Sequence, residues 1–585
     1  MELVVVAISG VQRFISESLS TADLHAGSAL MAELAWAMLT VVPPSRLVLP
    51  SKLPDEQGRV PSRVVVLSDD GAGRDLAGKM AKSAQAAWEK RLARALSGKP
   101  VPKTPGFPAV QWVVAPFEDG GYAEGWSAAQ AALRARKRIR GFPGYHVRPL
   151  AICTLTGRWA AEPPSDGGRS KSVAHRREAL SAVGYVKFRY GRQESDRFPS
   201  TWSIATAPYR DAIIRVGEDD AEVWGAAVDL KDACERLGAA GESRLGTALR
   251  RSSTLRGLAT STEETLRWLN EVEGSWCLAD SWDPAQLRRA HDLAEDPDHA
   301  LCMPGREAAR RLVRKAQAAG IPAPSSYLAV LAQDADHLGE RLGRFPQGID
   351  PVTWQRQVSA ALDNIAGRQV DDIELSHLGR VVYAGGDDLL ALVPAERVLA
   401  AAREANRLFA DDHELNELLD KPSASSAIVF FHASWPLQSA IAAARELLKD
   451  AKKRSRPGLG ITVLTRGGER TRVVLPWLDR SGQVPVPAIT HLEDLVAATA
   501  GPLSGRLASG LEVDRDALSE LSQEWLEREL ARRALRHGIA AGKAPAVGRL
   551  LASLCVPVPG GRDFTDCADS LLVARFVAGQ ARVPA

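Results

Sequence analysis

The first 140 residues alternate between short apolar runs and longer stretches in which apolar residues recur every three or four positions. Short apolar runs predict buried strands, and the longer spacing predicts helices that bury one face. Strands that alternate with helices indicate an α/β or α+β domain. The predicted strands are 3–8, 63–67 and 109–115, and the predicted helices are 11–38, 76–96 and 125–139.

The next part of the chain, residues 151–320, shows no such alternation. Pro, Gly and Ser are concentrated over 162–172, which predicts a loop. Helical spacing returns over 245–272 and again over 284–318. We therefore expect an intervening domain made mostly of helices.

The most regular pattern follows, over residues 321–475. Its first six elements are predicted in the order strand, helix, strand, strand, helix, strand, which is the ferredoxin-like order and the architecture of a polymerase palm. From about residue 493 the spacing is helical, with a Pro/Gly-rich break at 556–562. The predicted strands are 327–332, 380–383, 389–393, 426–431 and 460–465, and the predicted helices are 353–366, 395–409 and 436–453.

Composition agrees with a globular protein and adds few constraints. The chain has 585 residues, 45% of them hydrophobic and 25% charged, with a net charge of +3. This length suggests roughly three to five domains. The charge is too small for a protein that coats nucleic acid, although local basic clusters either hold phosphates or are solvated helix faces.

The sequence also suggests where the protein is found. The N-terminus has no basic leader, and no apolar run approaches the length of a membrane span. The six cysteines are too scattered for a disulfide framework. We therefore expect a cytoplasmic protein that does not contact a membrane.

The strongest chemical signal is Gly385-Gly386-Asp387-Asp388, which joins two predicted strands as the tip of a hairpin. Adjacent carboxylates repel each other unless a cation neutralises them, so this tip is a candidate Mg²⁺ site. The glycines leave room for a triphosphate to approach the backbone. The same four residues also suit an ordinary turn, because Gly and Asp tolerate unusual backbone angles.

A third carboxylate makes the metal site the better interpretation. The first strand of the predicted palm ends in Asp334, and in a ferredoxin-like sheet this strand lies beside the hairpin. Metal ions there would hold a triphosphate and activate a ribose hydroxyl, which attacks an α-phosphate as pyrophosphate leaves. The helix before the last strand ends in Lys452, Lys453 and Arg454, and a lysine there either neutralises the triphosphate or complements the helix dipole.

A series of motifs resembles the large polymerase-cyclase subunit of type III CRISPR–Cas effector complexes, in its Cmr-branch form. The likeness covers nearly the whole chain in the right order. The stretches that carry it are 8–15, 21–28, 135–142, 153–157, 334–339, the hairpin 385–388 and 425–437.

The resemblance implies an α+β fold with four parts. These are a first ferredoxin-like palm at 1–150, an intervening mostly helical domain at 151–320, a second palm at 321–480 with the Gly-Gly-Asp-Asp hairpin, and a C-terminal helical domain at 481–585. The first palm, which has no acidic hairpin of its own, is expected to help hold a second ATP at the interface between the palms.

The resemblance also implies an activity and partners. The family converts ATP into cyclic oligoadenylates when guide RNA (crRNA) pairs with target RNA, within a complex of other effector subunits. By this resemblance Asp334, Asp387 and Asp388 hold Mg²⁺ or Mn²⁺ and carry the catalysis. Gly385 and Gly386 lie against ATP, and Ser425 and Lys453 contact nucleotide.

Three features depart from the family pattern. The chain starts at the first palm, without the His-Asp nuclease domain of many relatives, so we expect no DNA cleavage; His291-Asp292 is interpreted as an incidental pair. Cys153 has no Cys-x-x-Cys partner, so we expect no cysteine-ligated zinc. Ala335 stands where a glycine is common, and a methyl group at a strand end is tolerable.

Two alternative functions stay open. One is a GGDEF-like cyclase that makes cyclic dinucleotides from GTP, although such enzymes usually pair identical domains. The other is a catalytically silent scaffold subunit of the RNA-guided complex, which would not need the three aspartates.

Overall fold

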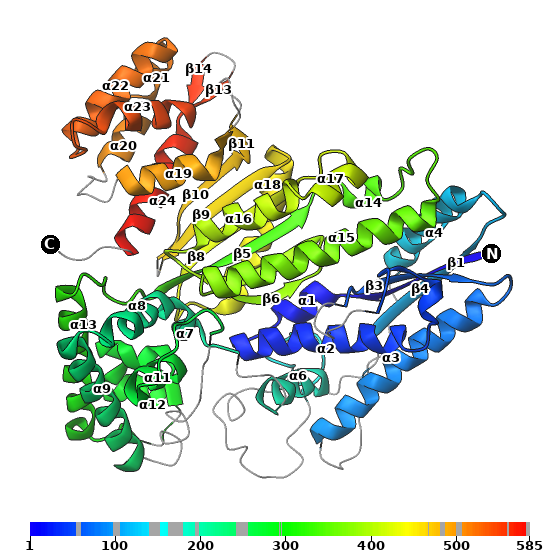
Figure 1. The fold of residues 1–585 in the computed structure, drawn as a ribbon, viewed down its shortest axis with the longest axis horizontal. Coiled ribbons are helices and arrows are strands. Elements are labelled where there is room, and N and C mark those ends of the chain that lie inside the picture. Colours follow the sequence, from blue (N-terminus) through cyan, green and yellow to red (C-terminus); the bar gives the residue numbers. More distant parts are fainter. Residues whose placement is uncertain are drawn as a thin grey trace.

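The computed structural model has four parts, which are separated by colour in Figure 1. A sheet near the N-terminus lies at the right, a larger sheet lies in the centre, and two helical parts lie at the left. No helix within the described residues is long and apolar enough to cross a lipid bilayer. The structure describes residues 1–53, 60–96, 104, 106–139, 152–161, 180–193, 198–240, 255–291, 293, 295–465, 467–479, 486–498, 506–558 and 561–580.

The first sheet has the strand order β2-β3-β1-β4 and is antiparallel throughout. This is the ferredoxin-like order, with the first strand in the interior of the sheet. Its central strand is buried on both faces, which explains the unbroken apolar run at the N-terminus. The strands are β1 (Glu2–Ser9), β2 (Leu47–Leu49), β3 (Arg63–Ser68) and β4 (Ala109–Pro116).

The helix predicted over 11–38 is two helices, α1 (Val11–Ser16) and α2 (Thr21–Leu39). The prediction of one helix was wrong because the apolar spacing continues through the break. Ser20 and Asp23 form a reciprocal capping box that starts α2: Asp23 N donates to Ser20 Oγ, and Ser20 N donates to the Asp23 carboxylate. The predicted helices that follow are present as α3 (Gly73–Leu96) and α4 (Tyr122–Arg138).

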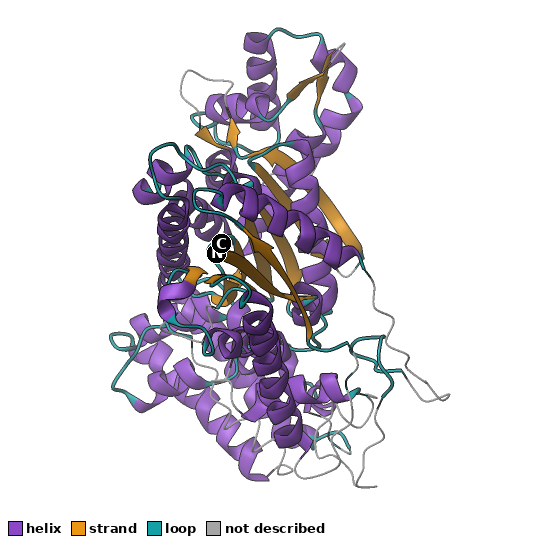
Figure 2. Cartoon of the chain, turned by 90° about the vertical axis from the view of Figure 1, so that its right-hand side faces the viewer, coloured by secondary structure: helices purple, strands orange, loops and turns teal. Residues whose placement is uncertain are grey.

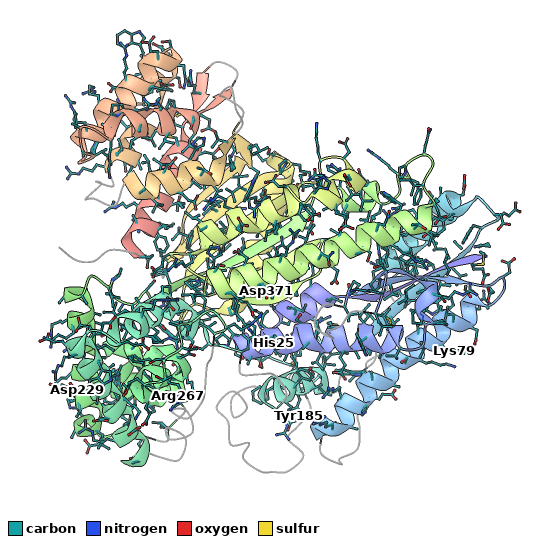
Figure 3. All side chains as sticks on the ribbon, viewed as in Figure 1. His25, Lys79, Tyr185, Asp229, Arg267 and Asp371 are labelled. Atoms are coloured by element: carbon teal, nitrogen blue, oxygen red, sulfur yellow. The ribbon has the colours of Figure 1, made fainter. Side chains whose placement is uncertain are left out.

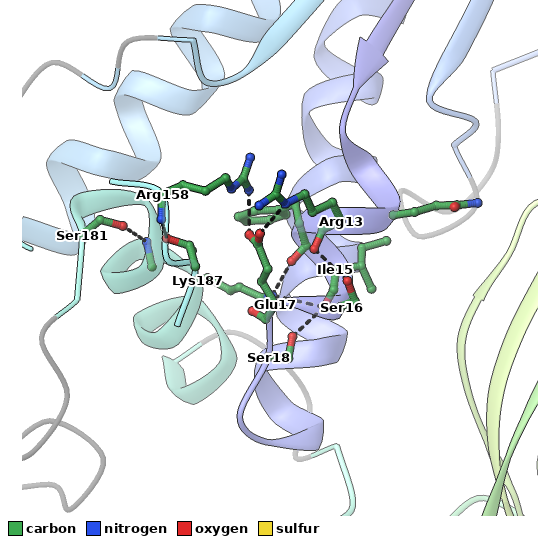
Figure 4. A network of polar contacts seen from close by, with 12 residues as sticks. Arg13, Ile15, Ser16, Glu17, Ser18, Arg158, Ser181 and Lys187 are labelled. Carbon is green, nitrogen blue, oxygen red and sulfur yellow. Dashed lines mark hydrogen bonds and ion pairs between the residues drawn. The ribbon is translucent and has the colours of Figure 1, made fainter. Parts of the chain in front are cut away.

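A helix from beyond residue 150 completes the first palm. Residues of α6 (Ala182–Gln193) pack in the core between the first sheet, α2 and α3. Lys187 is buried, and its ammonium donates to the carbonyls of Phe14 (2.6 Å), Ile15 (3.2 Å) and Glu17 (2.6 Å) at the end of α1 (Figure 4). Burial lowers the pKa of Lys187 to about 7. The core of the first palm therefore extends past residue 150.

The intervening part is helical, as predicted, and has a core of its own. Of the predicted helix 245–272, only 264–271 is helical among the residues that the structure describes. Residues 241–254 and the predicted loop 162–172 lie outside the described residues. Asp229, labelled in Figure 3, pairs with Arg311 at 2.6 Å across two of the helices. The helices are α7 (Thr201–Ala205), α8 (Ala207–Gly217), α9 (Ala221–Ala240), α11 (Glu264–Glu271), α12 (Pro284–His291) and α13 (His299–Ala318).

The second sheet has the order β10-β9-β8-β5-β7-β6. Its part β8-β5-β7-β6 is antiparallel and repeats the order of the first sheet, so the prediction of two ferredoxin-like palms is confirmed. Strand β9 is parallel to β8 and continues into the hairpin with β10, which the sequence did not predict as a strand. The strands are β5 (Tyr327–Ala335), β6 (Arg380–Ala384), β7 (Asp388–Pro394), β8 (Ala424–His432), β9 (Gly458–Thr465) and β10 (Gly468–Pro476).

Helices on both sides of the strands bury the second sheet, and Figure 2 shows the strands running through the middle of the molecule. The helix α18 lies against β8 and β9, and α16 packs on the opposite face. The helices of this part are α14 (Leu338–Arg341), α15 (Pro351–Asp371), α16 (Val398–Ala410), α17 (His413–Leu419) and α18 (Leu437–Arg454).

The C-terminal part is helical, as predicted, and packs on the face of the second sheet that carries α16. The predicted Pro/Gly-rich break forms a hairpin of β13 (Val556–Val558) and β14 (Gly561–Asp563). Arg454, at the end of α18, pairs with buried Asp566 of the last helix. The helices are α19 (Ala488–Ala498), α20 (Arg506–Val513), α21 (Arg515–Ser519), α22 (Gln523–Arg536), α23 (Ala544–Ser553) and α24 (Thr565–Gln580).

The two palms are joined through α15 and α18. Arg356 of α15 donates to the carbonyls of Ser45 (2.6 Å) and Leu47 (2.8 Å) beside β2. Arg445 of α18 donates to Ser16 Oγ of α1 at 2.8 Å. The hairpin end of the second palm is thereby held against the first palm.

Candidate active site

The tip of the β6–β7 hairpin lies at the junction of the two palms. Gly385 N donates to the carbonyl of Asp388 at 2.9 Å and closes the turn. A Cβ on Gly385 would lie 2.8 Å from Asp388 Oδ1, so the missing side chain leaves space beside the carboxylates. At position 386 only glycine fits, for a different reason. The φ of Gly386 is +85°, and a Cβ there would lie 2.7 Å from the carbonyl oxygen of Leu362 in α15. The hairpin needs Gly386 to pack on a helix, whereas Gly385 faces the acids.

The structure brings Asp334, Asp387 and Asp388 together. Asp334 of β5 is the direct partner of Asp388 across the β5–β7 ladder. The backbone N–H of Ala335 donates to the carbonyl of Asp387 at 2.7 Å, which holds the tip against the end of β5. Because β5, the first strand of the second palm, lies beside the β6–β7 hairpin, three carboxylates gather at one edge of the sheet.

The three carboxylates crowd one another. Burial, followed by the charges of Asp387 and Asp334, raises the pKa of Asp388 to about 8. Burial and the charge of Asp334 also raise the pKa of Asp387. A cation would relieve this repulsion, and carboxylate oxygens are the ligands that Mg²⁺ prefers, so the residues fit that metal.

The carboxylate of Asp334 forms an ion pair with a lysine. The ammonium of Lys452, in the last turn of α18, contacts Asp334 and donates to the carbonyl of Ala335 at 3.2 Å. Within the described part of the chain, no three acidic, His or Cys side chains are already arranged around a common point. A metal held by all three aspartates therefore requires Asp334 to turn away from Lys452.

The lysine predicted to contact nucleotide was Lys453, and the structure places it elsewhere. Its side chain is 76% exposed and pairs with Asp450 at 3.4 Å, whereas that of Lys452 is 17% exposed and faces the acids. One residue along a helix turns the side chain by about 100°, so adjacent lysines point to different surroundings. The contact with the acidic cluster belongs to Lys452.

Ser425, also predicted to contact nucleotide, is fully buried inside the second palm. Its hydroxyl donates to the carboxylate of Asp336 at 2.9 Å and accepts from Gly458 N at 3.1 Å. These bonds use the hydroxyl to join β5, β8 and β9, and Ser425 does not line the cavity beside the acids, so its contact with nucleotide stays a prediction. Ser425 positions Asp336, and Asp336 lies 3.7 Å from the ammonium of Lys452.

A cavity of about 380 Å³ opens beside the acids and is shared by the two palms. A volume of this size suits a small organic ligand. From the second palm it is lined by the hairpin tip and α15, and from the first by α1, α2 and the start of β3. Its charged and amide side chains include Gln12, Lys52, Arg63, Asp363, Asp387 and Asp388.

The sequence did not single out the first-palm residues around the acids. Gln12 of α1 forms a side-chain hydrogen bond with Asp388. Arg445 of α18 donates to the Gln12 carbonyl and so positions α1. Arg445 and Lys452 are seven positions apart on α18, which places them on one face of the helix. That spacing was a signal in the sequence for both cations.

Other sequence candidates lie away from this cavity. His291 stacks on Trp276 in the intervening part, with ring centroids 5.5 Å apart, and Asp292 is outside the described residues. Cys153 is buried. Neither residue joins the acids.

Comparison with known proteins agrees with this geometry. Residues 3–93 match the family model described as CRISPR-associated protein Cmr2, N-terminal, and residues 327–458 match Cas10/Cmr2, second palm domain. The Cmr subunit Cmr2 of Pyrococcus furiosus is 32% identical over 178 residues, which are 26% of this chain and 20% of that protein. The Cmr2 of Saccharolobus solfataricus is 42% identical over 57 residues, 10% of this chain and 5% of that protein.

Two solved structures share the fold over nearly the whole chain. The type III-B Cmr-beta structure in its apo state has a TM-score of 0.66 at 14% identity and covers 99% of this chain and 82% of that one. The Cmr-beta structure bound to cognate target RNA has a TM-score of 0.63 at 13% identity, with coverages of 99% and 83%. One matched model lies in each palm, so both palms of this chain are similar to those of the Cas10/Cmr2 family.

Proposed function

We propose that this protein converts ATP into cyclic oligoadenylates when an RNA-guided complex recognises its target RNA. The observation that carries the proposal is the position of Asp387 and Asp388, which line a cavity shared by both palms and lie beside Asp334 at the end of β5. A cyclase that joins two nucleotides needs one metal-binding edge and room for two substrates. The cavity lies between the palms and opens beside the acids, so residues of both palms are placed to contact nucleotide there.

The roles of the residues follow from their positions. Asp334, Asp387 and Asp388 would hold Mg²⁺ or Mn²⁺, which supplies activation of a ribose 3′-hydroxyl and neutralises the triphosphate. Gly385 leaves space beside the carboxylates for the phosphates. Gln12 holds Asp388 from the first palm, and Lys452 is placed to neutralise charge near Asp334 once a metal takes over that carboxylate.

The partners we propose are other subunits of a type III CRISPR effector complex, crRNA and target RNA. The curated relatives are named as Cmr subunits, and one structure with the same fold is a Cmr-beta complex bound to target RNA. The net charge of +3 supports a subunit that leaves most RNA contacts to its partners.

The test is product analysis. The assembled complex is incubated with ATP or with GTP, Mg²⁺ and target RNA, and products are separated by chromatography and identified by mass spectrometry. We expect linear and cyclic adenylates from ATP only when target RNA is present. A cyclic guanylate as the sole product would instead identify a GTP cyclase, and the lack of any product would identify a scaffold.

Paired variants tie the product to the site. Asp387→Asn with Asp388→Asn should abolish the adenylates while the complex stays assembled. Asp69→Asn with Asp70→Asn is the matched control, because these adjacent acids lie on the outer surface of the first palm, paired with Arg46 and the N-terminus. Equal loss in both double variants, or survival of activity in the first, would contradict the assignment.

A further inference from the structure

We propose that Arg63 of the first palm binds the phosphate chain of a second nucleotide, opposite the carboxylates and without a metal ion. The inference rests on the proposed function, because it assigns one residue to the second of two substrates in the shared cavity. It adds a division of labour: the second palm neutralises phosphates with a bound cation, and the first palm does so with an arginine.

The two palms place different residues at equivalent positions. Asp388 is the first residue of β7, and its partner on the central strand β5 is Asp334. Arg63 is the first residue of β3, and its partner on the central strand β1 is Ala7. Because the two sheets have the same strand order, Arg63 occupies the place of Asp388, and Ala7 that of the neighbouring acid.

Arg63 lines the same cavity as the acids. It is half-buried, and its charge is close enough to Asp387 that each residue affects the other's pKa. Its Nη1 donates to Gln130 Oε1 of α4 at 3.3 Å, which orients the guanidinium from the first palm. A planar guanidinium held in this way can form two parallel hydrogen bonds with phosphate oxygens.

The rest of the cavity suits the remainder of a nucleotide. Val11, Ile15 and Met31 of the first palm line it, and Val358 and Leu362 of α15 lie across from them. Apolar walls with a few charged groups at one end are typical of sites that enclose a base and sugar while fixing the phosphates.

The charge pattern has a measurable consequence. A nucleotide held by Asp334, Asp387 and Asp388 needs a divalent cation, because carboxylates alone repel phosphate. A nucleotide held by Arg63 needs none, since the neutralising charge is built into the chain. The first-palm site should therefore retain ATP when divalent cations are removed, and the second-palm site should not.

The experiment measures ATP binding to the purified full-length chain by equilibrium dialysis, once with Mg²⁺ and once with excess EDTA. In EDTA we expect one ATP per chain, and Arg63→Ala should weaken that binding roughly ten- to a hundredfold. Arg63→Lys should retain part of the ATP binding, because the lysine ammonium keeps the positive charge but cannot form the two parallel hydrogen bonds of the guanidinium. Asp387→Asn with Asp388→Asn should leave binding in EDTA intact.

The matched control is Arg46→Ala, since Arg46 is a surface arginine of the same palm that pairs with Asp69 at 2.7 Å. The melting temperature identifies any variant that fails to fold. If Arg63→Ala does not fold, the ATP affinity of Arg63→Lys in EDTA tests the inference instead. Wild-type protein that binds no ATP in EDTA, or an Arg63→Ala protein that binds it as the wild type does, would overturn the inference.

The same samples separate this inference from the proposed function. If the wild-type complex makes adenylates but Arg63→Ala leaves ATP binding unchanged, only the role of Arg63 fails. If ATP binds in EDTA through Arg63 but the complex makes no product with Mg²⁺ and target RNA, the cyclase function fails and the phosphate site stands.

Discussion

The two palms have the same strand order and opposite charge at the same place. In the second palm the hairpin strand starts with Asp388 opposite Asp334, and in the first it starts with Arg63 opposite Ala7. Both positions face one cavity. The two palms therefore share a framework and differ in the charge at this ladder position, and in our proposal this difference decides whether a metal ion or an arginine neutralises the phosphates.

The palms also differ in what supports the site. In the second palm, the added strand β9 brings Gly458 to Ser425, which in turn holds Asp336 near Lys452. The first palm has no such added strand among its described residues. Its support is the buried Lys187, which fixes the end of α1 and with it Gln12, the residue that reaches Asp388.

The largest effect is expected when the second palm receives, at position 388, the arginine that the first palm has at position 63. Asp388→Arg should lower adenylate production roughly a thousandfold or more, because the metal edge loses a ligand and gains a like charge. The melting temperature without Mg²⁺ should rise, since the new charge offsets the repulsion between Asp334 and Asp387. Product assays and thermal melts measure both effects, and a product yield close to that of the wild type would refute the metal assignment.

Two neighbouring lysines sharpen the picture of the second palm. Lys452→Ala should lower the rate roughly ten- to a hundredfold, because the ammonium beside Asp334 is lost. Lys453→Ala is the matched control and should stay within about twofold, since an exposed ion pair contributes little. Rate assays at saturating ATP compare the two, and a larger effect of Lys453→Ala would reverse our assignment.

The contact between the palms can be loosened on its own. Arg445→Ala removes the bonds from α18 to Ser16 and to the Gln12 carbonyl, so α1 should exchange its amide hydrogens faster. We expect a rate loss of about three- to tenfold, smaller than for Lys452→Ala, because no ligand of the metal changes. Unchanged exchange in α1 would show that other contacts hold the palms together.

The smallest effect concerns stability. Burial raises the pKa of Glu396, between β7 and α16, to about 7. A carboxyl with a raised pKa stabilises the fold below its unfolded pKa of about 4.5, and this stability is lost as pH rises through 7. Glu396→Gln should therefore raise the free energy of unfolding by about 1–3 kcal/mol at pH 8 and by little at pH 5. Melting curves of both proteins at the two pH values test this.

The contribution of Lys187 to the stability of the first palm should change with pH in the opposite direction. The pKa of Lys187 is lowered to about 7, so its folded form binds fewer protons than its unfolded form between pH 7 and the ordinary lysine value of 10.5. Its contribution to stability rises with pH over that window. The difference between the wild-type and Glu396→Gln melts at pH 8 reports on Glu396 alone, because Lys187 contributes equally to both proteins.

Most of the fold and the acidic cluster could be predicted from the sequence. The strand order alone predicts that Asp334 lies beside the hairpin. One apolar run ends at Asp334, and two others flank the hairpin tip. Three-residue β2 carries too short a signal, and the capping box at Ser20 is hidden within continuous apolar spacing. Boundaries of this kind depend on local hydrogen bonds more than on hydrophobic pattern.

The remaining site residues depend on three-dimensional contacts. The choice between Lys452 and Lys453 is set by the rotation of α18, and the burial of Ser425 by its bond to Gly458 on β9. Arg63 looks like an ordinary strand-initial residue until the first sheet is known to repeat the order of the second. Sequence predicts the acids because two are adjacent and the third ends a strand. It does not single out Arg63 of β3 or Arg445 of α18, because these side chains meet the acids only in the folded chain.

The most direct test of the account is a structure of the complex with Mg²⁺ and a non-reactive ATP analogue, determined by cryo-electron microscopy. We predict two nucleotides in the cavity between the palms, one with its triphosphate at a metal held by Asp334, Asp387 and Asp388, and the other with its phosphates on Arg63. Nucleotide bound outside this cavity, or phosphates that contact neither the acids through a metal nor Arg63, would contradict it.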